Sequence, residues 1–218
     1  MIPLFHDFTD ATVLIFGGGP VGARKARRFA REARTVVVSP AFVDSDFGDS
    51  ELVRAAPDPG EIGGWLERHE PALVVAATDD EAVNDAIVDT AQAQNVLVNR
   101  ADRAGGREPG SVVVPATVAE PPVTVAIATG GTAPALSKYL RKDLEETLAG
   151  AGEMATLLGE LRRELKARSV PQHRRRQLVT SVVEDSTVWT ALRTGTTKPR
   201  QVIDDVIADE LVSGGESP

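Results

Sequence analysis

The first half of the chain alternates short, continuous apolar runs with longer segments in which apolar residues recur at helical spacing. A continuous apolar run of about 4 to 8 residues is typical of a strand that is buried on both faces of a parallel sheet. The apolar runs lie at 13–16, 35–39, 72–77 and 96–98. The segments between and after them predict helices at 22–34, 62–69 and 81–93. This alternation predicts a Rossmann-like α/β domain with a parallel sheet.

One stretch of this half departs from the alternation. Residues 42–59 are acidic and lack a clear period, which indicates a short strand mixed with loop. The helix at 62–69 is expected to end at Glu70-Pro71, because a residue that precedes proline is disfavoured in a helix.

The alternation of apolar runs and helical segments ends after Asp102. A polar, glycine-rich loop at 103–110 precedes two predicted strands at 111–116 and 123–128. Glu120-Pro121-Pro122 has turn chemistry and separates these strands. The pattern therefore predicts a small hairpin after the parallel sheet.

The rest of the chain reads as helical. Thr132 is the expected cap of an amphipathic helix with Pro134 in its first turn. From Glu153 onward the pattern is helical and charged, and Pro171 separates one helix from the next. We therefore expect an NAD-binding Rossmann domain at 1–112, a small α+β dimerisation and substrate segment at 113–148, a helical C-terminal domain at 149–212, and a flexible tail at 213–218.

Composition narrows the classes of protein that this chain can represent. The 218 residues are 42% hydrophobic and 26% charged, which allows a packed core and argues against general disorder. The formal net charge of −8 argues against wholesale electrostatic binding to nucleic acid or to an anionic membrane. Cysteine is absent, which excludes disulfides, thiolate metal sites and cysteine nucleophiles.

Targeting and metal signals are also weak. The N-terminus lacks the layout of a signal peptide, and no apolar run approaches the roughly 20 residues that span a bilayer. A soluble, cytoplasmic protein is therefore expected. His6, His69 and His173 are scattered without metal-ligand spacing, so no metal site is expected.

A glycine cluster follows the first apolar run. Gly17, Gly19 and Gly22 have the G-x-G-x-x-G spacing, between a predicted strand and a predicted helix. In that context the first glycine permits a tight turn, the second lets phosphate oxygens approach the backbone, and the third lets helix and strand pack closely. The helix N-terminus then offers free N–H groups to the anion. The cluster predicts a dinucleotide site, although a purely structural turn would use the same residues.

The second apolar run ends without the expected acid. Ser39 and Pro40 stand where a dinucleotide fold usually offers a carboxylate to the adenosine ribose. Serine neither binds the ribose hydroxyls strongly nor repels a 2′-phosphate, so the choice between NAD and NADP stays open. The basic residues of the following helix add positive charge, but a solvated helix face is the simpler interpretation for Arg24, Lys25, Arg27 and Arg28.

Polar residues follow the next two apolar runs. Thr78 and Asp79 come after 72–77, while Asn99 and Asp102 come after 96–98. Ligands of open parallel sheets bind at the carboxyl ends of the strands, so these side chains are candidates for the site. Asp79 serves equally well as a cap for the next helix. Asp102 is either an ordinary loop carboxylate or a general base facing the nicotinamide.

Taken together, these motifs resemble one known family. They are "PLF" near the start, "GGGPVGARKA", "VVSP", "AATDDEAVN", "VNRAD", "VVVPA" and "ATGGTAPALSKYLR", in this order over roughly residues 1 to 145. The chain resembles the precorrin-2 dehydrogenase/sirohydrochlorin ferrochelatase family, which includes the dehydrogenase module of siroheme synthases. The part after Gly150 is similar to the helical tail of that family only in kind.

The resemblance implies an NAD-dependent enzyme that oxidises precorrin-2 to sirohydrochlorin in siroheme biosynthesis. Some members of the family also insert ferrous iron, and the sequence leaves open whether this chain does so. The family forms homodimers through the segment that matches residues 113 to 145. Nothing after Gly150 resembles the methyltransferase half of trifunctional members. A non-catalytic Rossmann module that senses a dinucleotide or a haem precursor is the alternative from another class.

The resemblance also assigns roles to single residues. Asp102 matches the catalytic aspartate of the family. Pro20-Val21 and Ala41-Phe42 match positions that contact the nucleotide. Thr129 falls where some members carry a serine at the edge of the tetrapyrrole site. The loop after Asp102 is longer than in familiar members, so substrate fit there is expected to differ.

The implied substrate carries many carboxylates, whereas the chain is acidic, so recognition must be local. Gly130, Gly131 and Thr132 begin a predicted helix and offer backbone N–H groups to an anion. Countercharge is expected from Arg100, Arg103, Lys138 and Arg141.

Overall fold

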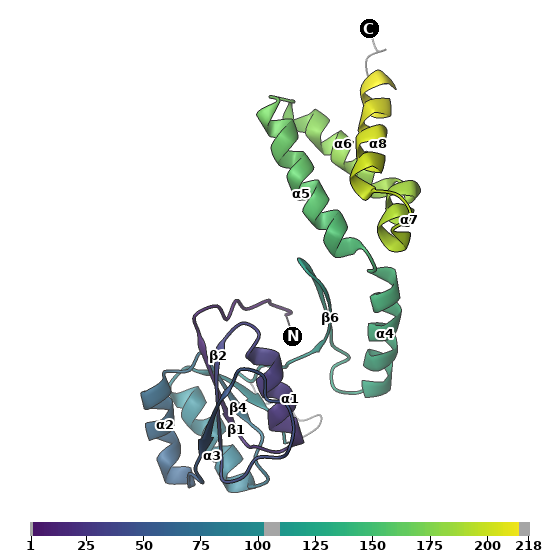
Figure 1. Ribbon diagram of the computed structural model, residues 1–218. Coiled ribbons are helices and arrows are strands. Elements are labelled where there is room, and N and C mark those ends of the chain that lie inside the picture. The colour runs from purple at the N-terminus through teal and green to yellow at the C-terminus, as the bar shows by residue number, and fades with distance from the viewer. Residues whose placement is uncertain (1, 103–109, 214–218) are drawn as a thin grey trace. The chain divides into compact units, whose positions relative to one another are not determined.

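The three-dimensional structure is a computed structural model that describes residues 2–102 and 110–213. The chain divides into two compact units, residues 1–114 and 115–218. Figure 1 shows both units, which are described separately below. Among the described residues, no helix is both long enough and apolar enough to cross a membrane.

A parallel sheet forms the centre of the first unit. Within residues 2–102 its five strands have the order β3-β2-β1-β4-β5. The strands are β1 (Thr12–Phe16), β2 (Arg34–Ser39), β3 (Glu51–Arg54), β4 (Leu73–Ala76) and β5 (Leu97–Arg100). The chain reverses its direction across the sheet between β1 and β4, so that the carboxyl ends of these two strands flank a crevice. The predicted Rossmann-like sheet is confirmed.

Helices cover both faces of this sheet (Figure 1). They are α1 (Pro20–Phe29) on one face, and α2 (Ile62–His69) and α3 (Glu81–Ala93) on the other. Val13 and Ile15 of β1 pack under α1, whereas Leu14 and Phe16 pack toward α2 and α3. The central strands β1, β2 and β4 are therefore buried on both sides, which explains their continuous apolar sequences, whereas the edge strand β3 is largely exposed.

Two elements near the candidate site have boundaries that differ from the prediction. The first helix covers 20–29 instead of 22–34, because Pro20 is favourable at the start of a helix and the chain already turns after Phe29. The last strand covers 97–100 instead of 96–98. Asn99 therefore lies inside the strand, not beyond its end.

The second unit begins with a hairpin and a helix. The hairpin pairs β6 (Ala116–Glu120) with β7 (Val123–Ile127), and α4 (Pro134–Thr147) follows. The strand predicted at 111–116 is wrong. Only Ser111 of that run makes an isolated parallel bridge, to Val98, while Val112 and Val114 pack on the α1 face of the first unit. The apolar character of this run reflects packing on a core, which no period distinguishes from a strand.

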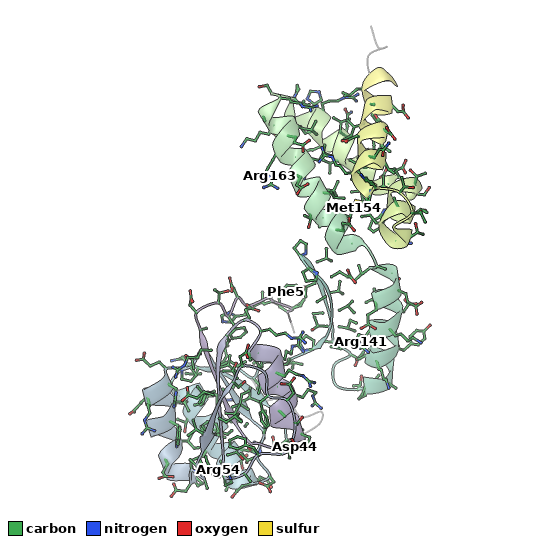
Figure 2. The ribbon with its side chains drawn as sticks, viewed as in Figure 1. Phe5, Asp44, Arg54, Arg141, Met154 and Arg163 are labelled. Carbon is green, nitrogen blue, oxygen red and sulfur yellow. The ribbon has the colours of Figure 1, made fainter. Side chains whose placement is uncertain are left out.

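The remaining helices form a small bundle. They are α5 (Ala151–Ala167), α6 (Gln172–Glu184), α7 (Ser186–Thr194) and α8 (Pro199–Ser213). Met154 of α5, labelled in Figure 2, belongs to a core that also contains Leu161, Leu178 and Ile203. The predicted separation of 113–148 from 149–212 stays a prediction, and 214–218 lie outside the described residues.

Candidate active site

The glycine cluster makes the turn from β1 into α1. Gly17 has φ +119°, and a Cβ atom at this position would lie 2.2 Å from the carbonyl oxygen of Ala77. A Cβ at Gly22 would lie 1.9 Å from the carbonyl oxygen of Gly17. The positive φ of Gly17 agrees with the tight turn predicted there, and a side chain on it would collide with the chain after β4. A side chain at Gly22 would push α1 away from the turn after β1, which agrees with the packing role predicted for this glycine.

Gly18 is a functional position that the sequence reasoning missed. A Cβ atom there would lie 2.2 Å from the carbonyl oxygen of Ala41 and 2.8 Å from the Phe42 ring. The Gly18 carbonyl accepts a hydrogen bond from the Val43 N–H at 3.0 Å. The missing side chain lets the loop after β2 close over the glycine turn. The unbroken run of three glycines, Gly17 to Gly19, is the sequence feature that could have identified Gly18.

Gly19 lies where the pyrophosphate of a dinucleotide is expected to bind. It is the N-cap of α1, and a Cβ atom on it would meet nothing within 4 Å. The first turn of α1 contains no acidic residue, and no side chain caps it. Free backbone N–H groups therefore face open space, as the pyrophosphate of a dinucleotide requires.

A cavity of about 690 Å³ lies beside this turn. Its size is typical of small-molecule and cofactor sites. Ten of the twelve residues predicted to bind the nucleotide line it: Gly17, Gly19, Pro20, Val21, Ser39, Pro40, Ala41, Phe42, Thr78 and Asp79. Gly22 and Asn99 do not line it. The lining residues that were not predicted are mostly apolar and include Val43, Ala56 and Pro57.

The end of β2 lacks a carboxylate, as the sequence indicated. Ser39 is buried, and its hydroxyl donates a hydrogen bond to the Ala41 carbonyl at 2.7 Å. That donor is consequently occupied within the protein. Arg54 pairs with Ser39 in the register of β2 and β3, and its guanidinium lies over the Phe42 ring at 5.9 Å. No acid repels a 2′-phosphate from this end of the cavity.

The loop after β4 is held by its own hydrogen bonds. The Thr78 hydroxyl donates to Asn84 Oδ1 at 2.8 Å, and the Asn84 amide donates back to the Thr78 carbonyl at 3.0 Å. Asp80, not Asp79, caps α3, because its carboxylate accepts hydrogen bonds from the Ala82 and Val83 N–H groups. The capping role considered for Asp79 is therefore wrong, and this residue instead lines the cavity.

A second cavity, of about 400 Å³, adjoins the first. Val21, Thr78 and Asp79 line both cavities. Asp102, which the resemblance singled out as catalytic, lines the second one. The two cavities thus share part of their walls, and Asp102 lines only the second one.

Arg100 holds the Asp102 carboxylate at two points. Its Nε lies 3.0 Å from Oδ1, and its Nη2 lies 3.2 Å from Oδ2. The same guanidinium donates through Nη1 to Asp85 of α3. The side chains of Arg100 and Asp102 are only 11% and 16% exposed. Hydrogen bonding to Asp102, and then to Asp85, raises the pKa of Arg100, so the guanidinium remains charged.

Arg100 was expected to supply countercharge to the substrate. The structure instead places it against two carboxylates of the protein. Asp85 escaped the sequence reasoning because it comes from the middle of α3, fifteen residues before Arg100. A two-point contact fixes the plane of the Asp102 carboxylate, as paired guanidinium and carboxylate groups usually do.

Asn99 points to the other face of the sheet. Its Oδ1 accepts a hydrogen bond from Lys25 Nζ at 2.9 Å, and its amide donates to the Val112 carbonyl at 2.8 Å. The predicted cofactor role of Asn99 is therefore not supported by its position, since it ties α1 and the segment after Ser111 to β5. Lys25 is likewise not a solvated residue of the helix face. Burial lowers its pKa to about 8, with smaller effects from Arg28 and Arg24.

The predicted substrate residues lie in the second unit. Thr129 donates to the Ala133 carbonyl at 3.2 Å and shares a 2.9 Å hydrogen bond with Ser137. Gly130 and Gly131 have φ of +71° and +81° and lead into α4. Thr132 is not the helix cap, because its hydroxyl donates back to the Thr129 carbonyl at 2.7 Å and Ala133 takes the cap position without a side-chain bond.

The other two described candidates for countercharge differ in whether they already have an acidic partner. Lys138 is exposed on α4, whereas Arg141 pairs with Glu145 one turn later. Arg103 lies outside the described residues.

Comparison with known proteins agrees with this geometry. Residues 4–116 match the protein family described as "Putative NAD(P)-binding". The chain is 32% identical over 222 residues to a protein of Methanosarcina barkeri named precorrin-2 dehydrogenase, and the match covers 97% of this chain and 96% of that protein.

Other relatives are longer. The chain is 34% identical to siroheme synthase 1 of Aeromonas salmonicida, and the match covers 99% of this chain but 46% of that protein. The chain therefore spans about half the length of that relative. Among solved structures, SirC, a precorrin-2 dehydrogenase, superposes with a TM-score of 0.67 at 24% identity, over 94% of this chain and 98% of that chain, which supports the fold.

Proposed function

The chain belongs to the precorrin-2 dehydrogenase family, and from this premise we propose that it oxidises precorrin-2 to sirohydrochlorin, with NAD as the hydride acceptor. One observation carries the proposal. The Asp102 carboxylate lines a cavity that adjoins, and shares Val21, Thr78 and Asp79 with, the cavity beside the glycine turn.

The residues of the first cavity fit a dinucleotide. The N–H groups around Gly19 and the uncharged first turn of α1 bind the pyrophosphate, and the space left by Gly18 lets the backbone approach it. Apolar residues such as Val43 and Pro57 exclude water from the flat rings. When bound, NAD supplies a two-electron acceptor for hydride.

Asp102 provides the matching proton acceptor. Dehydrogenation removes a hydride and a proton from neighbouring atoms of the macrocycle and leaves one new double bond. NAD, when bound, would accept the hydride, and a carboxylate oxygen of Asp102 would accept the proton. Arg100 fixes the plane of that carboxylate, so the base is oriented before the substrate arrives.

The charge of the second cavity indicates how the substrate enters. Among its described lining residues are three acids, Asp79, Glu81 and Asp102, and no Lys or Arg. Carboxylates of the macrocycle would be repelled there, so the reacting, uncharged part of the ring is the part that enters. We assign carboxylate recognition to Lys138 and to the backbone N–H groups of Gly130–Thr132.

The test is turnover of precorrin-2 with NAD, followed by the absorbance of sirohydrochlorin. Asp102→Asn keeps the shape of the side chain but removes the base, and loss of a general base typically costs about 10²–10⁴-fold in rate. NAD affinity, measured by calorimetry, should stay near the wild-type value. Turnover by Asp102→Asn at the wild-type rate would rule out this role for Asp102.

Gly19→Asp is the complementary variant. A Cβ at Gly19 meets no neighbouring atom, so the protein should fold normally. The new carboxylate would occupy the anion position at the helix N-terminus and repel the pyrophosphate. NAD affinity should fall by roughly 100-fold or more, the size of two lost charge-assisted hydrogen bonds. Unchanged NAD affinity would show that the glycine turn is not the cofactor site.

The same experiment separates the alternative functions. A non-catalytic sensor of dinucleotide or haem precursor would bind NAD but form no sirohydrochlorin. Parallel reactions with and without ferrous iron show whether the chain also inserts the metal. If it does, Asp102→Asn should reduce both activities, because one carboxylate would receive protons in each reaction.

We also propose that the chain acts as a homodimer. No residue of the fully described helix α4 is buried, and its Leu136 and Tyr139 are 48% and 67% exposed. A two-stranded hairpin with such a helix lacks a core of its own, so a second copy is the natural cover. Light scattering should give twice the chain mass of 23.1 kDa, and a monomer at working concentration would contradict the proposal.

A further inference from the structure

The connection between α5 and α6 concentrates positive charge in an acidic chain. The stretch 162–176 contains seven Lys and Arg residues and a single acid, Glu164, whereas the whole chain has a net charge of −8. Glu164 does not neutralise this stretch fully, because its carboxylate binds Arg200 of α8 at 2.6 Å. The excess positive charge therefore persists in the folded unit.

The fold gathers four of these cations around one concavity. A pocket of about 340 Å³ is lined by Arg162 and Lys166 of α5 and by Gln172, Arg175 and Arg176 of α6. No acid belongs to its described lining. Arg175 is partly buried, and its Nη1 donates to the Val170 carbonyl at 3.1 Å, which anchors the guanidinium at the pocket wall.

The other cations of the pocket have no acidic partner. Within the part of the chain that the structure describes, Arg162, Lys166 and Arg176 take part in no ion pair. Arg162 and Lys166 are also one helical turn apart, a spacing at which like charges destabilise a helix. Arg174, by contrast, is engaged in the fold, because it donates to the Glu210 carbonyl. The pocket thus keeps an uncompensated charge that a bound anion would neutralise.

We propose that this pocket binds a small multivalent anion that carries two or more carboxylate or phosphate groups. Guanidinium groups bind both oxyanions through paired hydrogen bonds, and four cations around one space favour a ligand with several negative charges. The site lies in the bundle of α5–α8, so the proposal is independent of the proposed dehydrogenase and extends beyond it. It gives the helical tail a binding function.

The experiment uses the full chain and calorimetric titration with inorganic pyrophosphate and, separately, with citrate. Gly19→Asp serves as the parent protein, so that the glycine turn contributes no anion binding. The double variant Arg162→Gln/Arg176→Gln removes two exposed charges that hold no contact in the fold. Loss of hydrogen bonds to charged groups should weaken binding roughly tenfold or more.

Arg163→Gln is the matched control. Arg163 is next to Arg162 in sequence but is absent from the pocket lining, and it projects from α5 in Figure 2 on the side away from α8. Its loss should change the affinity by less than about twofold, because a solvent-exposed charge outside the pocket is screened. Comparison of the two titrations tells whether phosphate or carboxylate is preferred.

Three results would overturn the proposal. The first is the absence of binding of either anion to the parent protein. The second is an equal loss of affinity in Arg163→Gln and in the double variant, which would indicate a general effect of net charge. The third is binding of a short duplex DNA in preference to both anions, with all three arginines contributing equally, which would indicate an extended nucleic-acid surface.

Discussion

Asn99 and Arg100 are neighbours on β5, yet they belong to two different environments. Asn99 faces α1 and contacts Lys25, whereas Arg100 faces α3 and contacts Asp85 and Asp102. Each side thus contains one cation held at the end of the same strand. On the Asn99 side the cation donates to a neutral amide, and on the Arg100 side the partners are two carboxylates.

The two environments shift the pKa values of the two cations in opposite directions. Burial lowers the pKa of Lys25 to about 8, whereas hydrogen bonds to carboxylates raise the pKa of Arg100. A cation with a neutral partner fastens secondary structure at an electrostatic cost, while a cation between two acids orients them at little cost. The Arg100 side therefore orients two carboxylates, whereas the Lys25 side joins α1 to β5.

The largest expected effect comes from removing the guanidinium group of Arg100. Arg100→Gln frees the Asp102 carboxylate to rotate, and a misplaced catalytic group costs up to about 100-fold in rate. We expect kcat for precorrin-2 to fall by roughly 10- to 100-fold, with NAD affinity unchanged.

Arg100→Lys and Arg34→Gln are the controls for this variant. Lysine restores the charge without the two-point contact, so it should recover kcat only in part. Arg34 forms an exposed ion pair with Glu51 at 2.9 Å on the edge of the same sheet, and its loss should leave kcat and NAD affinity unchanged. An Arg100→Gln enzyme with wild-type kcat would show that Arg100 does not position Asp102 for the reaction.

Much of the fold could be predicted because the central strands β1, β2 and β4 are buried on both faces. The helices at 62–69 and 81–93 agree with the structure residue by residue, since caps and a proline mark their ends. The run at 111–116 was misread as a strand, because its valines pack on a core while Ser111 makes only an isolated bridge to β5. Burial explains an apolar run, but its hydrogen-bonding partner depends on the rest of the fold.

The candidate site likewise contains parts that could be predicted from the sequence and parts that could not. The glycine turn could be predicted because its function depends on local backbone geometry, which glycine spacing records. The contacts of Arg100 with Asp85 and of Lys25 with Asn99 could not, because they join residues 15 and 74 positions apart. The sequence reasoning considered Asp79 as the cap of α3, whereas the structure uses its neighbour Asp80, a choice that depends on the backbone conformation after β4.

The smallest predicted effect concerns the Lys25 side and is seen in stability. The unfolded chain keeps the Lys25 proton up to the usual pKa of 10.5, whereas the folded chain releases it near 8. Between these values the unfolded state binds more protons, so the contribution of Lys25 to stability rises with pH and is constant below about 8. Lys25→Met removes this dependence. Relative to wild type, the variant should therefore lose on the order of 2 kcal/mol between about pH 7 and pH 10, as measured by urea unfolding. Lys142→Met, which removes an exposed lysine of α4, should run parallel to wild type over the same range. Equal pH dependence of wild type and Lys25→Met would mean that the Lys25 amine is solvated, and the contrast between the two faces of β5 would then disappear.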